Sequence, residues 1–116
     1  MKGGIFMYTV EEIKQKIIPI AKAHNLKSVW LIGSYARGDA TEESDIDLLF
    51  DGDGSDITTL LRASAMYADM KDLFCVGVDL VDMKALYAPR NQKTAFICIR
   101  NIERDRIMLY ERTKTP

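Results

Sequence analysis

The order of three segments in the first half of the chain constrains its fold most. A short apolar run is followed by a Gly-Ser turn and then by a second apolar run that begins with two aspartates. The run from Ser28 to Ile32 predicts a buried strand. Gly33-Ser34-Tyr35-Ala36-Arg37-Gly38 comes next, so we expect Gly33 to end the strand and a short helical turn to extend to Gly38. After a polar loop, Ser44-Asp45-Ile46-Asp47 leads into a second strand, expected from Asp45 to Phe50.

The flanking segments alternate between helical and strand-like patterns. Thr9 and Glu12 have the spacing of a capping box, which predicts a helix that ends near Asn25 and that Pro19 kinks or divides. The remaining expected elements are a turn over Asp51-Gly52-Asp53-Gly54, a helix from Ser55 or Asp56 to about Lys71, a strand from Phe74 to Val81, a break at Pro89, a helix from Thr94 to Ile102 and a strand from Ile107 to Tyr110. The pattern predicts an α/β (α+β) fold with a small mixed β-sheet flanked by helices.

Length and composition limit the classes of function. A chain of 116 residues fits a single domain, expected over residues 1–116 with residues 1–7 flexible. No run reaches the length of a membrane span or of a signal peptide, which predicts a cytoplasmic protein without a membrane partner. The 16 basic and 17 acidic residues give a formal charge of -1, which disfavours extensive nucleic-acid binding. Cys75 and Cys98 lie in apolar runs, so we expect two reduced, buried thiols.

Gly33 and Ser34 form a candidate phosphate site. A glycine lets the backbone approach a ligand closely, and the free N–H groups at the start of a helix favour an anion. The hydroxyl of Ser34 adds a hydrogen-bond donor. Arg37 lies three residues further on and is expected on the same side of the helical turn. It would contact a phosphate or anchor the loop through an acidic partner.

Asp45 and Asp47 form a candidate metal site. Alternate residues of a strand point to the same side, so both carboxylates share one face while Ile46 and Leu48 point into a core. Two adjacent carboxylates repel each other unless a cation lies between them. Mg²⁺ suits such a pair because it prefers oxygen ligands and is usually shared with substrate phosphates. With two ions, one would activate an attacking hydroxyl and the other would stabilise a pyrophosphate leaving group.

A third carboxylate is expected on a neighbouring strand. Asp79 is the main candidate, because Val78 and Leu80 would face the opposite side, and it would serve as a metal ligand and as the base for an acceptor hydroxyl. Asp82 is the alternative, although it would face away from Asp79 in a regular strand. The competing interpretation is that the Gly-Ser segment is only a turn and that the aspartates are solvated charges. The two segments occur together, in order and beside apolar runs, which favours a nucleoside triphosphate site with a divalent metal.

The segment from Gly33 through Gly38, followed by Ser44-Asp45-Ile46-Asp47-Leu48, resembles the signature of the DNA polymerase beta-like nucleotidyltransferase superfamily. Within this superfamily, the chain resembles the minimal nucleotidyltransferase (MNT) branch. The resemblance lies in its short length and in the segments Val78-Asp79-Leu80-Val81 and Leu109-Tyr110-Glu111. The resemblance implies the polymerase beta-like fold, ATP as nucleotide donor and Mg²⁺, expected as two ions. It also implies catalytic and metal-binding roles for Asp45, Asp47 and Asp79, and nucleotide binding by Gly33, Ser34, Arg37 and Gly38.

The resemblance further implies a protein partner. MNT proteins of this size often act with a separate helical protein of the HEPN type, which is typically an RNase toxin. By this analogy the chain is an antitoxin that transfers AMP from ATP to a hydroxyl of the toxin, with a tyrosine as the expected acceptor. Two alternatives stay open at this point. The chain would neutralise its partner by binding alone, or it would adenylylate a small molecule such as an antibiotic.

Overall fold

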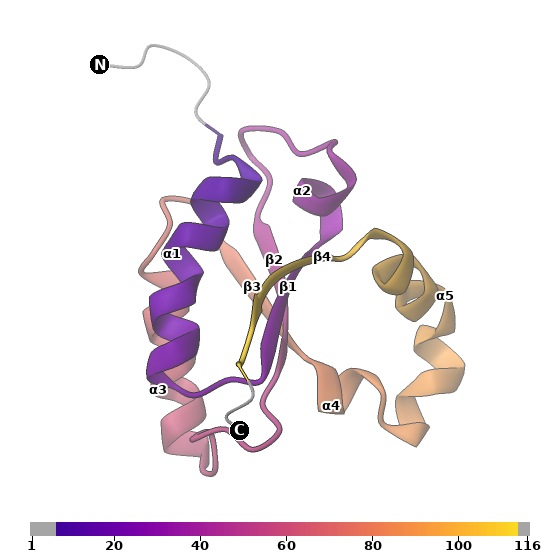
Figure 1. The fold of residues 1–116 in the computed structure, drawn as a ribbon. Helices are drawn as coiled ribbons and strands as arrows, with labels where there is room; N and C mark the ends of the chain where they lie inside the picture. Colours follow the sequence, from indigo (N-terminus) through magenta and orange to yellow (C-terminus); the bar gives the residue numbers. More distant parts are fainter. Residues whose placement is uncertain (1–6, 114–116) are drawn as a thin grey trace.

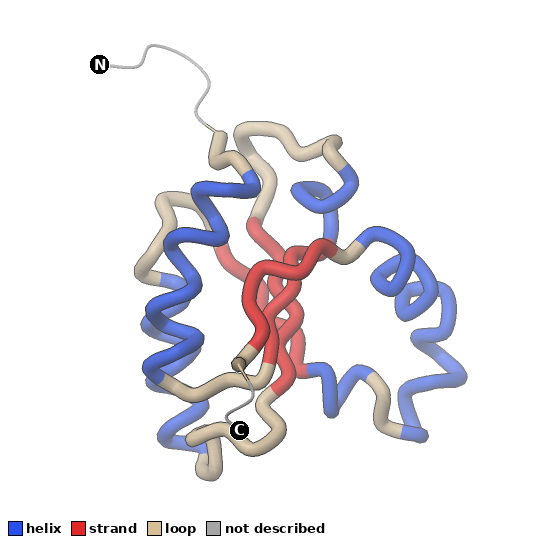
Figure 2. Tube along the Cα trace, viewed as in Figure 1, coloured by secondary structure: helices blue, strands red, loops and turns tan. Residues whose placement is uncertain are grey.

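A four-stranded mixed sheet carries helices on both of its faces (Figures 1 and 2). The computed structural model describes residues 7–113, apart from the side chains of residues 91–94, so six of the seven residues expected to be flexible lie outside the described residues. In chain order the elements are α1 (Val10–Ala23), β1 (Ser28–Ile32), α2 (Gly33–Arg37), β2 (Ile46–Asp51), α3 (Leu60–Lys71), β3 (Val78–Asp82), α4 (Met83–Leu86), α5 (Pro89–Asp105) and β4 (Ile107–Glu111). The predicted fold class is confirmed.

The strand order of the sheet is β3-β2-β1-β4. β1 pairs antiparallel with β2 and with β4, whereas β2 and β3 run parallel. Figure 1 shows α1 and α3 on one face of the sheet, α4 and α5 on the other, and α2 at the end of β1. The parallel pairing of β2 with β3 decides which residues of these two strands become neighbours.

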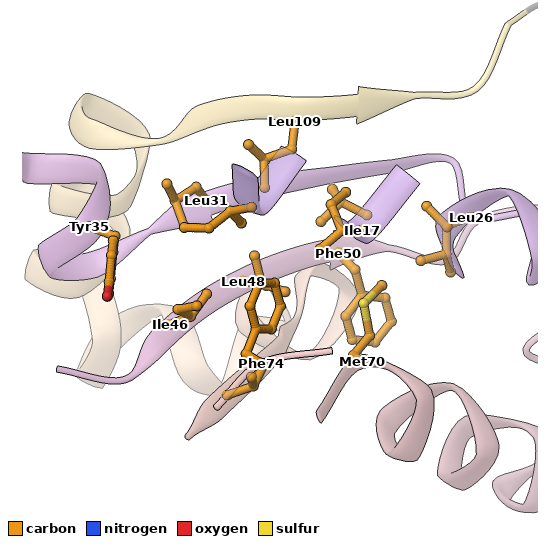
Figure 3. Close-up of a cluster of buried hydrophobic side chains, with 14 of the residues drawn as sticks. Ile17, Leu26, Leu31, Tyr35, Ile46, Leu48, Phe50, Met70, Phe74 and Leu109 are labelled. Atoms are coloured by element: carbon orange, nitrogen blue, oxygen red, sulfur yellow. The ribbon is translucent and has the colours of Figure 1, made fainter. Parts of the chain in front are cut away.

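The larger hydrophobic core lies between the sheet and the helices α1 and α3 (Figure 3). Each strand sends alternate residues into it, as the period of a strand requires. Its fully buried side chains include Ile13 and Ile17 of α1, Val29 and Leu31 of β1, Ile46 and Leu48 of β2, and Met66 and Met70 of α3. The residues between these strand positions, among them Asp47, therefore belong to the opposite face.

A smaller core lies on that opposite face. Ile32, Leu49 and Ile102 are buried there, so α5 is fixed to the sheet mainly through its C-terminal half. Burying a side chain of this size contributes about 1.5–3 kcal/mol. This small core holds α5 over the same face of the sheet. The polar residues of β2 and β3 on this face therefore lie beside it, under the helix.

Helix α1 agrees with the capping-box prediction. The backbone N–H of Glu12 donates to Oγ1 of Thr9 at 3.0 Å, and that of Thr9 donates to Oε1 of Glu12 at 2.8 Å. The helix continues through Pro19, so the expectation that Pro19 divides it is wrong. Pro19 is exposed, and water can solvate the carbonyl group that loses its donor there.

Helix α3 begins at Leu60, later than predicted. The residues before it make loop hydrogen bonds instead: the N–H of Asp56 donates to the carbonyl of His24 at 3.1 Å, and Thr59 caps the helix by accepting from the N–H of Arg62 at 3.1 Å. Leu60 and Leu61 continue the apolar spacing of the sequence but are 84% and 80% exposed. The apolar period of the sequence was therefore misleading over this turn.

Other differences fall between residues 74 and 105. β3 starts at Val78 rather than Phe74, because the N–H of Cys75 donates to the hydroxyl of Tyr8 at 2.9 Å and not to a strand. The short helix α4 was not predicted, and α5 is longer at both ends than expected.

Cys75 and Cys98 are free, as expected, but both are exposed, so the prediction of buried thiols is wrong. None of the helices described in the structure is long and apolar enough to cross a membrane.

Candidate active site

The register of the parallel strands brings two predicted site residues together. Asp47 of β2 lies directly opposite Asp79 of β3. Ile46 and Val78, which precede them, are both buried in the larger core, so the two carboxylates project from the other face of the sheet, toward the side of α5. Asp45 comes immediately before β2 and lies close enough to influence the ionisation of Asp47. The structure thus groups the three predicted carboxylates at one end of two neighbouring strands.

Two glycines pack directly against these carboxylates. Gly33 has φ +74°, and a Cβ at this position would collide with Oδ2 of Asp47. A Cβ at Gly77 would come within 2.5 Å of Oδ1 of Asp45, and the Gly77 carbonyl accepts from the N–H of Ile46 at 2.9 Å. Gly33 was predicted as a site residue, whereas Gly77 was missed. The signal that was available for Gly77 is its position directly before the strand that carries Asp79.

A cavity of about 700 Å³ opens between this end of the sheet and α5. Gly33, Arg37, Asp47 and Asp79 line one side of it, next to Ile32, Leu80 and Val81. Helix α5 supplies the other wall through Ile97, Cys98, Asn101, Ile102 and Asp105. The α5 residues were not predicted as part of the site, because a helix distant in sequence gives no local sign of where it packs.

The electrostatics of the cavity centre on Asp47. Its pKa is raised from 3.8 to about 6, first because the group is partly removed from water, and then because the carboxylates of Asp79 and Asp45 repel its negative charge. Arg37 acts in the opposite direction and lowers the pKa of Asp47. The site is therefore one in which negative charge is costly unless a cation compensates for it.

Arg37 is the basic residue that faces this acidic group from α2. Its Nε donates to Oδ2 of Asp39 at 3.3 Å, which matches one of the two predicted roles, the anchoring of the loop. It also contributes to the lowered pKa of Asp105, although the main cause there is the hydrogen bond from Arg104. Arg37 thus lies within electrostatic range of carboxylates on both walls of the cavity.

The remaining predicted residues lie outside the cavity lining. The lining found among the described residues includes none of Asp45, Ser34 and Gly38. Gly38 ends α2 with φ +87°, and its N–H donates to the carbonyl of Ser34 at 3.0 Å. Asp82 caps α4 by accepting from the N–H of Lys84 at 3.0 Å and pairs in register with Phe50, at the other end of the strands. This geometry favours Asp79 over Asp82 as the third carboxylate.

The donor set fits a magnesium ion that is shared with a substrate. Within residues 7–113 no three acidic, histidine or cysteine side chains already converge as a complete metal cluster. Mg²⁺ is usually bound through one or two carboxylates together with substrate phosphates and water. Asp47 and Asp79, adjacent in the sheet and facing a cavity, supply such a pair.

Comparisons with known proteins show the family to which this fold belongs. Residues 15–115 match the family described as "Polymerase beta, Nucleotidyltransferase". A candidate protein adenylyltransferase of Methanocaldococcus jannaschii is 46% identical over 79 residues, which cover 67% of this chain and 82% of the relative. The protein adenylyltransferase MntA of Thermococcus cleftensis is 31% identical over 84 residues, which cover 69% of this chain and 83% of the relative.

A solved structure shares the fold. It is described as a tri-AMPylated Shewanella oneidensis HEPN toxin in complex with an MNT antitoxin, and the matching chain has a TM-score of 0.59 at 18% identity. The match covers 90% of this chain and 74% of the other. The predicted resemblance and the polymerase beta-like fold are confirmed. This chain belongs to the polymerase beta nucleotidyltransferase family.

Proposed function

We propose that this chain is a Mg²⁺-dependent adenylyltransferase that transfers AMP from ATP to a hydroxyl of a HEPN-type RNase toxin and acts as its antitoxin in the cytoplasm. The observation that carries the proposal is the register that sets Asp47 beside Asp79, with the backbone of Gly33 against the Asp47 carboxylate. The names of the relatives support protein adenylylation, and the description of the solved complex supports a HEPN-type acceptor.

The chain's own residues would divide the work as follows. Asp45, Asp47 and Asp79 hold Mg²⁺, which, when bound, supplies positive charge that stabilises the triphosphate and the departing pyrophosphate. The backbone at Gly33 and Ser34 binds the triphosphate, for which the missing side chain of Gly33 leaves room beside Asp47. Arg37, which lines the same side of the cavity as Asp47, contributes a further positive charge toward the phosphates.

The reaction is a displacement at the α-phosphorus of ATP. The acceptor oxygen forms a bond to this phosphorus, the bond from the phosphorus to the oxygen bridging the β-phosphate breaks, and pyrophosphate leaves. Asp79 takes the hydroxyl proton on a carboxylate oxygen. Because Asp79 is exposed, a hydroxyl carried by another protein can approach it. A tyrosine is the acceptor that we propose.

Intact-mass analysis tests the proposal. A HEPN-type protein, as the proposed acceptor, is incubated with the chain, ATP and Mg²⁺, and peptide mapping then locates the modified residue. We expect the partner to gain one or more AMP units on tyrosine, and no gain with the Asp47→Asn variant. An unchanged mass in a tight complex would replace the proposal with neutralisation by binding alone. Modification of an added small molecule but not of the partner would replace it with small-molecule adenylylation.

A further inference from the structure

Helix α5 exposes two large apolar side chains. Phe96 and Ile97 are consecutive in sequence and are 51% and 68% exposed. Buried contacts of α5 lie at Ile99 and Ile102, so the helix has an apolar side that the sheet does not cover. Exposed apolar patches on a folded protein mark interaction sites more often than isolated apolar residues do.

A shallow hollow with two guanidinium groups adjoins these side chains. It has a volume of about 330 Å³ and is lined by Ile97, Arg100, Asn101 and Arg104. The guanidinium carbon of Arg100 lies 5.7 Å from the centre of the Phe96 ring, and Arg104 pairs with Asp105 at 2.8 Å. The hollow therefore combines apolar surface, positive charge and an amide.

This surface continues into the candidate active site. Ile97 and Asn101 line both the hollow and the large cavity that contains Asp47 and Asp79. A protein acceptor has to bring its hydroxyl into that cavity, so the body of the acceptor must cover part of the rim. The hollow beside this rim is apolar and basic, whereas the chain as a whole carries a formal charge of -1. The α5 wall of the cavity also carries the acidic Asp105, which pairs with Arg104.

We propose that the α5 surface, defined here as Phe96, Ile97, Arg100 and Arg104, docks the acceptor protein. The segment that it fits presents an apolar side chain next to an acidic one, since the apolar group would cover Phe96 and Ile97 while the carboxylate would pair with Arg100. The inference rests on the proposed function, because it assumes that the acceptor is a protein. It adds the surface that selects this protein and the chemistry of the segment that is selected.

The chain offers a matched control. Leu60 and Leu61 of α3 are more exposed than Phe96 and Ile97, but α3 lies on the face of the sheet opposite to α5 (Figure 1). Exposed apolar area alone would therefore favour the α3 pair as a docking site. Proximity to the cavity favours the α5 surface.

The test compares three single variants, Phe96→Ala, Arg100→Glu and Leu61→Ala, of which none alters the lining of the large cavity. Thermal unfolding first verifies that each variant folds. Calorimetry then measures the Kd for the HEPN-type acceptor named in the proposed function, and intact mass follows AMP transfer to it. We expect Phe96→Ala to raise the Kd about 10-fold or more, as for an aromatic contact at the centre of an interface. Arg100→Glu should raise the Kd and weaken its salt dependence, and Leu61→Ala should change it less than about twofold.

Each contrary outcome has one meaning. A Kd that changes only with Leu61→Ala, or with none of the three, overturns the docking surface. Self-association that Phe96→Ala abolishes, with partner binding unchanged, also overturns it and assigns the surface to a second copy of the chain. AMP transfer by the wild type with an unaltered Kd for Phe96→Ala removes the docking surface but keeps the proposed function. A Phe96-dependent complex without AMP transfer keeps the surface and contradicts the proposed activity.

Discussion

Asp47 combines a proposed functional role with a cost in stability. Its pKa of about 6 lies above the ordinary 3.8, so in the window between these values the folded chain keeps a proton that the unfolded chain has lost. The free energy of unfolding contributed by this group therefore falls as the pH rises from about 4 to about 6. A shift of this size corresponds to about 3 kcal/mol at most, and solvent around a partly exposed group reduces it further.

We predict that Asp47→Asn stabilises the chain in metal-free buffer at pH 7.5 by about 1 kcal/mol. Urea unfolding at several pH values measures the effect, and the advantage of the variant over the wild type should shrink between pH 6 and pH 4. Asp53→Asn, which changes a carboxylate that is 81% exposed, serves as the control and should alter stability by less than about 0.5 kcal/mol. A variant less stable than the wild type at pH 7.5 would contradict this account of Asp47.

Gly33 and Gly38 separate two costs of adding a side chain. Both have positive φ, so alanine strains the backbone at either position, by about 1 kcal/mol. Only at Gly33 would the added Cβ also collide with the Asp47 carboxylate, whereas no atom lies within 4 Å of a Cβ at Gly38. We predict that Gly33→Ala destabilises more than Gly38→Ala in urea unfolding and displaces Asp47, with a loss of nucleotidyl transfer of about 100-fold. Equal effects of the two substitutions on stability and transfer would contradict the close contact between Gly33 and Asp47.

Single residues of the site were predictable to the extent that a local pattern carried them. The apolar neighbours of Asp47 and of Asp79 predicted that these two carboxylates share a face, and the structure has both on one face of the sheet. Asp45 lies before β2, so its predicted place on the strand has no counterpart in the structure. Gly77 and Asp105 have no such pattern. Their place beside the carboxylates depends on the pairing of distant strands and on the packing of α5, which a periodicity does not encode.

At the level of elements, the buried strands were the most predictable. β1 has the predicted bounds, and β4 differs from its prediction by one residue, because short apolar runs bounded by turns leave few other choices. The start of α3 was not predictable in the same way. Loop hydrogen bonds of Asp56 and Ile57 compete with the helix there, and Leu60 and Leu61 mimic a core face without being buried.

The capping box of α1 gives a prediction for an element. Thr9→Ala removes the side-chain acceptor of the Glu12 N–H and should lower the free energy of unfolding by about 1 kcal/mol. AMP transfer should not change, because α1 lies on the face of the sheet away from the cavity (Figure 1). Ser64→Ala, at an exposed position inside α3, is the control and should change stability by less than about 0.5 kcal/mol. A loss of transfer in Thr9→Ala at a temperature where it is fully folded would show that α1 takes part in the site.

At the scale of the whole molecule, the two faces of the sheet serve different purposes. The face toward α1 and α3 carries the larger core (Figure 3). The face toward α5 carries a small core, the cavity and the docking surface that we propose. ATP and Mg²⁺ should therefore bind to the face of the sheet that has the smaller core. Their binding should raise the free energy of unfolding of the chain.

We predict that ATP and Mg²⁺ together raise the unfolding midpoint of the wild type. At a ligand concentration 100 times the Kd, the gain in the free energy of unfolding is about 2.7 kcal/mol, which amounts to several degrees for a chain of this size. Thermal unfolding with ATP alone, Mg²⁺ alone and both together measures the coupling. Asp47→Asn should lose most of the joint effect. An equal shift from ATP in the presence of EDTA would show that the nucleotide binds without the metal site.

The measurement that tests the account most directly is the number of AMP units that the wild type, Asp79→Asn and Asp82→Asn transfer to the HEPN-type partner, read by intact mass. The two aspartates belong to the same strand, but only Asp79 lies opposite Asp47 and lines the cavity, while Asp82 caps α4. We predict transfer by the wild type and by Asp82→Asn, and none by Asp79→Asn. Transfer that survives Asp79→Asn, or that is lost only in Asp82→Asn, would contradict the assignment of the catalytic carboxylates to the parallel pair of β2 and β3.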